Sequence, residues 1–241
     1  MEKRLDITVS RLAGISRAIA KELITEGKVC VNGKTTAKPG ALVSANDRIE
    51  YNLPETSYVS RGGHKLRSAL NTFGITLDGR VCLDVGASTG GFTDCMLQHG
   101  AALVYALDVG TAQLHPTLKA HVRVRSIENT NILAVAPNAF APPPTFAAVD
   151  VSFVSATKLL PHIVGITNIQ QIVVLVKPQF ECGRAQLSKH GIVHSEKAHK
   201  QAIANVTAAA ESNGLHAVGF CESPIKGGDG NTEYLALYLK S

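Results

Sequence analysis

The chain has 241 residues and a mass of 25.5 kDa, a length that fits one or two ordinary domains. Hydrophobic residues make up 45% of it and charged residues 18%, which provides enough apolar surface for a core and excludes wholesale disorder. The net charge of +5 is confined to residues 1–67, which hold twelve Lys/Arg and seven Asp/Glu, since residues 68–241 hold twelve of each. A basic N-terminal segment suits an acidic partner such as a nucleic acid.

Several classes of protein are excluded by what the chain lacks. Its five cysteines are scattered and form no CxxC pair, so neither a disulfide framework nor a zinc ribbon is indicated. His190 and His194 have no acidic or cysteine partner at ligand spacing, and we expect no metal site. The N-terminus carries no apolar secretory signal, and the uncharged runs at 129–149 and 159–176 are too interrupted by prolines or polar residues to span a bilayer. We therefore expect a cytoplasmic protein with no membrane span.

The first sixty residues predict a small unit that begins with two helices. Apolar residues recur at helical spacing over 5–12 and again over 15–23, with an interruption at Gly14. Ser16 is placed to cap the second helix, which ends near Gly27. The unit therefore opens with a helical hairpin.

A hairpin of strands follows in the same unit, giving the order α-α-β. Residues 28–31 predict a strand that runs into Asn32-Gly33, a strong signal for a tight hairpin turn, and residues 48–51 close a small sheet. Over residues 3–51 the pattern resembles the RNA-binding module first known from a small-subunit ribosomal protein, the fourth in its series. The resemblance implies that basic side chains of the unit contact RNA phosphates; the alternative is a solvated face with charges spread for solubility. The RNA-binding residues that we predict are Arg4, Arg11, Arg17, Lys21, Lys28, Lys34 and Arg61.

From Val81 onward, strands alternate with helices, which is typical of an α/β sheet with parallel strands. We expect a helix from Phe92 to about His99 and an alanine-rich helix over 195–213, with Ser195 as its N-cap. The predicted strands cover residues 81–85, 103–107, 122–125, 146–151, 172–176, 217–221 and 234–239.

A glycine-rich segment, residues 86–91, leaves the first of these strands, where α/β sheets bind ligands. Dinucleotide sites use the form GxGxxG, whose second glycine lets the backbone approach a pyrophosphate. Here Ser88 holds that position, so a nucleoside cofactor without phosphates, such as S-adenosylmethionine, fits better. Asp108 ends the second strand at about the ~20-residue spacing expected of an acid that accepts ribose hydroxyls. The alternative is a tight turn without a ligand and an aspartate that caps a helix.

Five motifs occur in order along the chain. They are Ser60-Arg61-Gly62-Gly63-His64-Lys65-Leu66, the segment 84–94, the segment 106–110 followed by Gln113-Leu114, Asp150-Val151-Ser152-Phe153, and Val176-Lys177-Pro178-Gln179-Phe180-Glu181. In this order they resemble the TlyA family of ribosomal RNA 2′-O-methyltransferases, often labelled hemolysins, whose catalytic domain is similar to the FtsJ type. The resemblance covers essentially the whole chain.

This resemblance implies a fold, a cofactor and a partner. The expected fold is α/β, a Rossmann-like class I methyltransferase sheet with a small N-terminal α-α-β RNA-binding domain. We expect the RNA-binding domain over residues 1–56, a linker over 57–64 and the methyltransferase domain over 65–241. The implied cofactor is S-adenosyl-L-methionine, and the implied partner is ribosomal RNA or a ribosomal subunit, with the oligomeric state and the modified nucleotide left open.

The resemblance also implies a Lys-Asp-Lys-Glu tetrad, which falls on Lys65, Asp150, Lys177 and Glu233. Desolvation or neighbouring cations can bring a lysine into the range of a useful base, and we predict that Lys177 takes or attracts the 2′-hydroxyl proton. Asp150 and Glu233 would hold the two lysines in position. The expected cofactor-binding residues are Asp84, Gly86, Ala87, Ser88, Gly90, Gly91, Phe92, Asp108, Val109, Glu128 and Asn129.

Two other functions compete with methyl transfer. A membrane-acting hemolysin, as the family label suggests, requires a spanning or strongly amphipathic segment, and the sequence shows neither. A non-catalytic RNA-binding or ribosome assembly factor would keep the fold without binding the cofactor.

Overall fold

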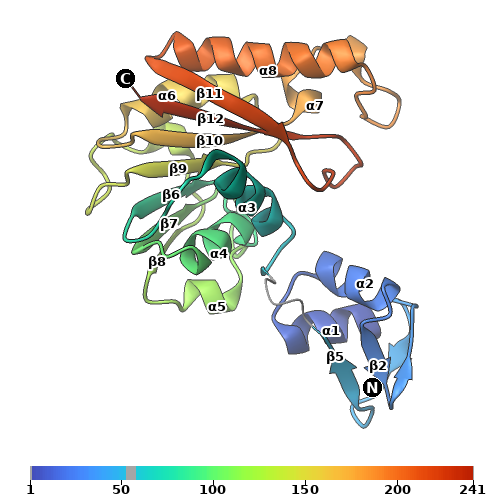
Figure 1. Cartoon of the computed structure of the whole chain (residues 1–241). Coiled ribbons are helices and arrows are strands. Elements are labelled where there is room, and N and C mark those ends of the chain that lie inside the picture. The colour runs from blue at the N-terminus through green and yellow to red at the C-terminus, as the bar shows by residue number, and fades with distance from the viewer. Residues whose placement is uncertain (1, 53–57, 241) are drawn as a thin grey trace.

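The computed structural model of the chain describes residues 2–52 and 58–240. Residues 2–52 form a small unit and residues 58–240 form a larger α/β domain (Figure 1). The predicted boundary between residues 56 and 57 lies outside the described residues. Within the described residues, no helix has both the length and the apolar character needed to cross a membrane.

The helical hairpin predicted for the N-terminal unit is confirmed. Helix α1 (Leu5–Ala13) ends at Gly14 in the left-handed conformation, and the Ser16 hydroxyl accepts a hydrogen bond from the Ile19 amide at the start of α2 (Arg17–Thr25). The apolar stripes of both helices pack together into a core of their own. Leu12 is an exception, because its side chain lies at the surface.

Short strands complete the unit. The predicted hairpin is formed by β2 (Val29–Val31) and β3 (Lys34–Thr35), and β5 (Ile49–Tyr51) pairs with the other edge of β2. Asn32 and Gly33 both have positive φ, as a two-residue hairpin turn requires. A second pair, β1 (Lys3–Arg4) with β4 (Leu42–Val43), was not predicted; strands of two residues leave no periodicity in a sequence.

A seven-stranded sheet forms the centre of the large domain, in the order β11-β12-β10-β9-β6-β7-β8. Six strands run in the same direction, while β12 runs antiparallel between β10 and β11. The strands are β6 (Val81–Val85), β7 (Leu103–Leu107), β8 (Val124–Ile127), β9 (Phe146–Val149), β10 (Gln171–Val176), β11 (Leu215–Glu222) and β12 (Tyr234–Lys240). Strand β9 ends two residues before the predicted end; its paired residues stop at Val149, although the Asp150 amide still donates to the Val85 carbonyl at 2.9 Å.

Helices cover both faces of the sheet (Figure 1). One face packs against α3 (Gly62–Phe73), α4 (Gly91–Gln98) and α5 (Pro116–Lys119), and the other against α6 (Leu160–Gly165) and α8 (Glu196–Glu211). The remaining elements are α7 (Pro178–Glu181) and the 3₁₀ turns η1 (Ile132–Ala134), η2 (Ala156–Lys158) and η3 (Arg184–Gln186). Because successive strand residues enter opposite cores, the parallel strands are mostly apolar.

Helix α3 departs from the prediction for the junction. Residues 62–64, assigned to the linker, form the first turn of α3, so Lys65 lies on a helix and not on a connecting segment. Two adjacent glycines make a helix start hard to predict from the sequence, because glycine has low helix propensity. Gly63 is nevertheless required, since a Cβ there would overlap the buried ring of Tyr58, and a Cβ at Gly91 would overlap the Ser60 side chain.

This packing makes Gly63→Ala a destabilising substitution. The methyl group would meet the Tyr58 ring, and overpacking of this kind lowers the free energy of unfolding by about 1–3 kcal/mol. Denaturant unfolding measures the change. Gly165→Ala is the control, since no atom lies near a Cβ at that position; equal stability of the two variants would contradict the close approach of α3 and Tyr58.

Candidate active site

The glycine-rich turn between β6 and α4 is the first part of the site. Gly86, Ser88 and Gly90 all have positive φ, and a Cβ on Gly86 would overlap the carbonyl oxygen of Asp150. The turn therefore lies directly against the end of the neighbouring strand β9, which only glycine allows.

Asp108 lies at the end of β7, as predicted, and faces this turn. Its Oδ2 accepts a hydrogen bond from the Ser88 amide at 2.7 Å, and its Oδ1 accepts one from the Gly110 amide at 2.7 Å. Each carboxylate oxygen has a second lone pair. Asp108 therefore fixes the turn and keeps acceptor capacity for hydroxyl groups.

Two adjoining cavities open beside the turn, of about 330 and 440 Å³, a size usual for small-molecule sites. They share Gly86, Ser88, Asp150 and Ser152. The larger cavity is mostly apolar. Its apolar lining includes Val109, Ile132, Leu133 and Val151.

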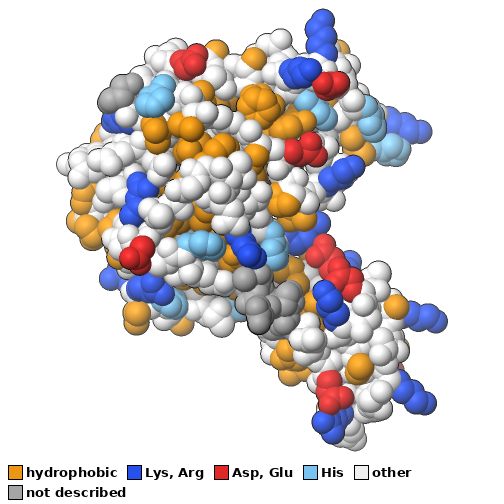
Figure 2. Space-filling view, in the orientation of Figure 1, with side chains coloured by type: hydrophobic (Ala, Val, Ile, Leu, Met, Phe, Trp, Pro, Cys, Tyr) orange, Lys and Arg blue, Asp and Glu red, His pale blue; other side chains and the backbone are white. Residues whose placement is uncertain are grey.

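The smaller cavity lies between the two units of the chain. Lys65 and Lys177 line it together with the turn, and Ser16 and Ala18 at the start of α2 line it from the N-terminal unit. Figure 2 shows the large domain and the N-terminal unit separated by a notch on one side of the molecule. Whatever binds in this cavity contacts residues from both units.

Each lysine of the cavity is paired with one carboxylate, Lys65 with the buried Glu233 and Lys177 with the partly buried Asp150. Lys65 Nζ donates to Glu233 Oε2 at 2.5 Å, and Lys177 Nζ lies 2.6 Å from Asp150 Oδ1. Lys177 also donates to the Ser152 hydroxyl at 2.9 Å. Lys65, Lys177 and Glu233 are 9%, 8% and 3% exposed, so removing one partner would strand a buried charge. The structure thus brings the four predicted catalytic residues together as two ion pairs.

The turn before Glu233 contains two structurally important residues that the sequence did not single out as site residues, Gly227 and Asn231. A Cβ at Gly227 would lie 2.5 Å from Glu233 Oε1, so glycine makes room for the carboxylate. The buried Asn231 accepts from the Val193 amide at 2.9 Å and donates to the Gly191 carbonyl at 3.0 Å. Asn231 therefore ties the turn before β12 to the segment before α8. Its only sequence signal is its place beside a glycine-rich turn.

The predicted cofactor-binding residues divide into two groups. Those that line a cavity are Gly86, Ala87, Ser88, Gly91, Phe92, Asp108 and Val109. Those that line neither are Asp84, Gly90, Glu128 and Asn129, and Gly90 faces Leu114 and Leu118 instead. Residues of the larger cavity that were not predicted as site residues include Gln113, Asn131 and Ile132; Gln113 belongs to a family motif, whereas the other two have no signal of their own.

Two acidic residues of the second group organise the loops around the site. Glu128 accepts hydrogen bonds from the amides of Gln113 and Leu114 and pairs with Lys119 at 2.7 Å; the Lys119 contact and these amides lower its pKa to about 2. Asp84 is fully buried and accepts the Thr93 hydroxyl at 2.6 Å, while its Oδ1 has no partner among the described residues. Burial raises the pKa of Asp84 to about 7.

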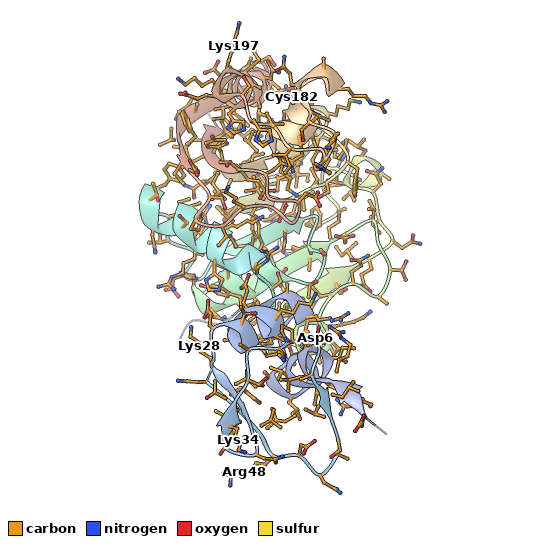
Figure 3. The ribbon with its side chains drawn as sticks, turned by 90° about the vertical axis from the view of Figure 1, so that its right-hand side faces the viewer. Asp6, Lys28, Lys34, Arg48, Cys182 and Lys197 are labelled. Carbon is orange, nitrogen blue, oxygen red and sulfur yellow. The ribbon has the colours of Figure 1, made fainter. Side chains whose placement is uncertain are left out.

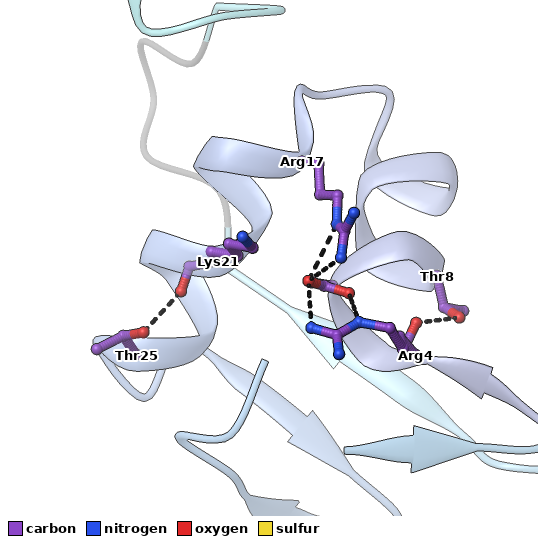
Figure 4. A network of polar contacts seen from close by, with 6 residues as sticks. Arg4, Thr8, Arg17, Lys21 and Thr25 are labelled. Atoms are coloured by element: carbon purple, nitrogen blue, oxygen red, sulfur yellow. Dashed lines mark hydrogen bonds and ion pairs between the residues drawn. The ribbon is translucent and has the colours of Figure 1, made fainter. Parts of the chain in front are cut away.

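The predicted RNA-binding residues differ in whether their side chains form an ion pair with a carboxylate. Arg4 and Arg17 both pair with the buried Asp6, at 3.1 and 3.0 Å (Figure 4), and the Arg4 hydrogen bond contributes most to a lowered Asp6 pKa. Lys28 pairs with Glu26 at 2.7 Å, and Arg61 lies 3.6 Å from Glu22. Within residues 2–52 and 58–240, the residues of the set without an ion pair are Arg11, Lys21 and Lys34.

Two features define the large domain as a class I methyltransferase domain. One is the strand order, with an antiparallel strand next to the edge, and the other is the glycine-rich turn that faces an acid at the end of the next strand. A small unit of an RNA-binding type precedes this domain in the chain. Comparison with known families agrees. The FtsJ-like methyltransferase model matches residues 58–239, and the S4 domain model matches residues 3–49. The chain belongs to the FtsJ-like methyltransferase family and carries an N-terminal S4 domain.

Individual relatives cover nearly the whole chain. One is the 16S/23S rRNA (cytidine-2′-O)-methyltransferase TlyA of Mycobacterium tuberculosis, 42% identical over 94% of this chain and 85% of the relative. Another is hemolysin A of Brachyspira hyodysenteriae, 42% identical over 93% of this chain and 94% of the relative. The solved structure of a hemolysin-named protein from Streptococcus thermophilus matches with a TM-score of 0.80 and 41% identity, covering 100% of this chain and 89% of the other.

The buried Asp84 predicts a pH-dependent stability. Because its pKa rises from an ordinary 3.8 to about 7, the folded protein binds the proton more tightly than the unfolded chain. The stabilisation is fully present below about pH 3.8 and is lost as the pH rises toward 7. The melting temperature of the wild type relative to Asp84→Asn should therefore fall between pH 4.5 and 7 and level off above. The exposed Asp78→Asn is the control, and a constant difference across this range would contradict a raised pKa.

Proposed function

We propose that the chain transfers the methyl group of S-adenosyl-L-methionine to a ribose 2′-hydroxyl of ribosomal RNA. The observation that carries the proposal is the pair of lysine–carboxylate contacts whose lysines both line the cavity beside the glycine-rich turn. The family and the 42% identical relative named as a 16S/23S rRNA (cytidine-2′-O)-methyltransferase support the same reaction.

The residues present fit this cofactor. Gly86 and Ser88 would contact its methionine portion at the turn, and Asp108 would accept the ribose hydroxyls with its free lone pairs. The apolar walls of the larger cavity, among them Ile132 and Leu133, would take the adenine ring. When bound there, the cofactor supplies an electrophilic methyl group on a sulfonium.

The four residues of the two ion pairs would act on the hydroxyl. Lys177 lies where its Nζ would take the 2′-hydroxyl proton in its neutral amine form, or stabilise the developing oxyanion in its ammonium form. Asp150 and Ser152 hold its ammonium nitrogen from two directions, at 2.6 and 2.9 Å. Lys65, held by Glu233, provides positive charge in the same cavity. The protein thus orients the nucleophile and manages its proton.

The N-terminal unit would bring the RNA to this cavity. Its S4 domain match and its excess of positive charge favour binding to phosphates, and Lys and Arg side chains stand out along its outer edge (Figure 2). Because Ser16 and Ala18 line the smaller cavity, RNA held by this unit would lie close to Lys177. A ribosomal RNA substrate would also place the protein in the cytoplasm.

Replacing Lys177 tests the catalytic assignment. In Lys177→Ala, methyl transfer to ribosomal RNA should fall about 100-fold or more, because a positioned proton acceptor is lost. Affinity for S-adenosylmethionine, measured by calorimetry, should change by less than about twofold, since the turn and Asp108 are untouched. The matched control is Lys197→Ala, whose side chain projects from the outer side of α8 (Figure 3).

Three outcomes would count against the proposal. Full turnover by Lys177→Ala would contradict the proposed catalytic role of that lysine. Wild-type protein that binds ribosomal subunits but not the cofactor would favour a non-catalytic assembly factor. Vesicle leakage that Lys177→Ala leaves undiminished would favour the hemolysin alternative.

The free basic residues of the N-terminal unit give a second test. Replacing both Arg11 and Lys21 by Gln should weaken RNA binding and reduce the slope of log K against log salt by about 0.7–0.9 for each lost phosphate contact. Cofactor affinity should stay the same, because neither residue lines a cavity. Filter binding over a salt series measures the slope, with Lys197→Gln as the control. An unchanged slope in the double variant would mean that the RNA does not contact Arg11 or Lys21.

A further inference from the structure

One carboxylate of the large domain links the two segments that carry the catalytic pair. Glu181, at the end of α7, accepts the Ser155 hydroxyl at 2.5 Å and the Ala156 amide at 2.7 Å. Ser155 and Ala156 belong to the loop after β9, which begins at Asp150, whereas Glu181 belongs to the short helix that follows Lys177 and β10. The same two segments meet at Lys177 through Asp150 and Ser152.

The loop between these two attachments is strained. Phe153 has a φ of +67°, a conformation that is unfavourable for a bulky residue, and its side chain is 93% exposed. Its ring touches Phe180 of α7, with centroids 5.5 Å apart. Such a backbone persists only when the surroundings hold it, and the attachments lie on either side of it, at Ser152 and at Ser155.

Stability alone does not explain why a carboxylate holds this loop, because burying the Glu181 carboxylate costs free energy. Ser155 already caps η2 by accepting the Thr157 amide at 3.2 Å. Glu181 is half-buried, its burial raises its pKa, and no cation pairs with it among the described residues. An unpaired carboxylate in such surroundings costs free energy that its two hydrogen bonds only partly offset.

We propose that Glu181 is a positioning residue for methyl transfer, whose carboxylate clamps the loop after β9 so that Asp150 and Ser152 keep their contacts with Lys177. This inference rests on the proposed function, because it assigns Glu181 to the same reaction. It predicts that loosening the clamp misaligns the partners of Lys177 while leaving the cofactor turn, on the other side of Asp150, intact.

Four variants test the clamp. Glu181→Ala should lower kcat about 10-fold to 100-fold, the effect expected of a small misplacement at a reacting centre, with an unchanged cofactor Kd. Glu181→Gln should recover most of the rate, because its amide can still accept from Ala156 and bond to Ser155. Ser155→Ala removes one of the two bonds to Glu181 together with the Ser155 cap on η2, leaves the Ala156 bond in place, and should give a smaller loss. Glu211→Ala, at an exposed glutamate ending α8, should match the wild type.

Hydrogen exchange supplies a readout that does not depend on activity. In the free protein, amides of residues 151–158 should exchange faster in Glu181→Ala than in the wild type or Glu211→Ala, while the amides of α4 should not change. If Glu181→Ala proves too unstable, Ser155→Ala carries the same comparison. Unchanged exchange and unchanged kcat in Ser155→Ala and Glu181→Ala would overturn the clamp.

The wild-type assay separates this proposal from the one on which it rests. If the wild type transfers methyl groups to ribosomal RNA and Glu181→Ala does so equally fast, only the clamp fails. If the wild type transfers none, the proposed function fails, and faster exchange in Glu181→Ala would then show a purely structural contact. A loss of rate in Glu181→Gln as large as in Glu181→Ala would also contradict the clamp, because it would require the charge and not the hydrogen bonds.

Discussion

Two lysines are buried at the carboxyl edge of the sheet, and each needs a carboxylate within reach, because an unpaired charge in that environment is strongly destabilising. Much of the surrounding structure follows from this constraint. Gly86 lets the turn after β6 lie against Asp150, and Gly227 leaves room for Glu233. The break of β9 after Val149 frees Asp150 to meet Lys177 from the next strand. Gly86, Gly227 and the early end of β9 therefore all help to keep the two buried lysines paired with carboxylates.

The same pairing rule changes how the basic N-terminal unit is understood. Its excess of positive charge is real, but part of it is used inside the unit, where the buried Asp6 of α1 pairs with Arg4 of β1 and Arg17 of α2 (Figure 4). Both guanidinium groups stay about half exposed and could meet a phosphate as well as Asp6. Arg11, Lys21 and Lys34 carry charges that the described part of the chain does not neutralise. The charge available to RNA is therefore unevenly distributed over the unit.

The sequence predicted most of the fold, and its failures have physical causes. Strands β6, β7 and β10 were recognised because parallel strands buried on both faces are continuous apolar runs. Ser16 and Ser195 were recognised as caps because a hydroxyl at that place satisfies a free amide. The start of α3 was missed because Gly62 and Gly63 are poor helix formers; the close approach to Tyr58 that requires Gly63 is not local.

For the site, the sequence by itself determined the residue types: a glycine-rich turn with Asp108 at the end of the next strand, and two lysines and two acids in family motifs. Turns and the positions of helices and strands along the chain are local or periodic properties, so a single sequence can reveal them. Only the tertiary structure decided the partners. Lys65 meets a carboxylate 168 residues away, Glu128 turns to the loop at Gln113, and Glu181 reaches the loop after β9. Such contacts depend on how elements pack across the sheet, which no local pattern records.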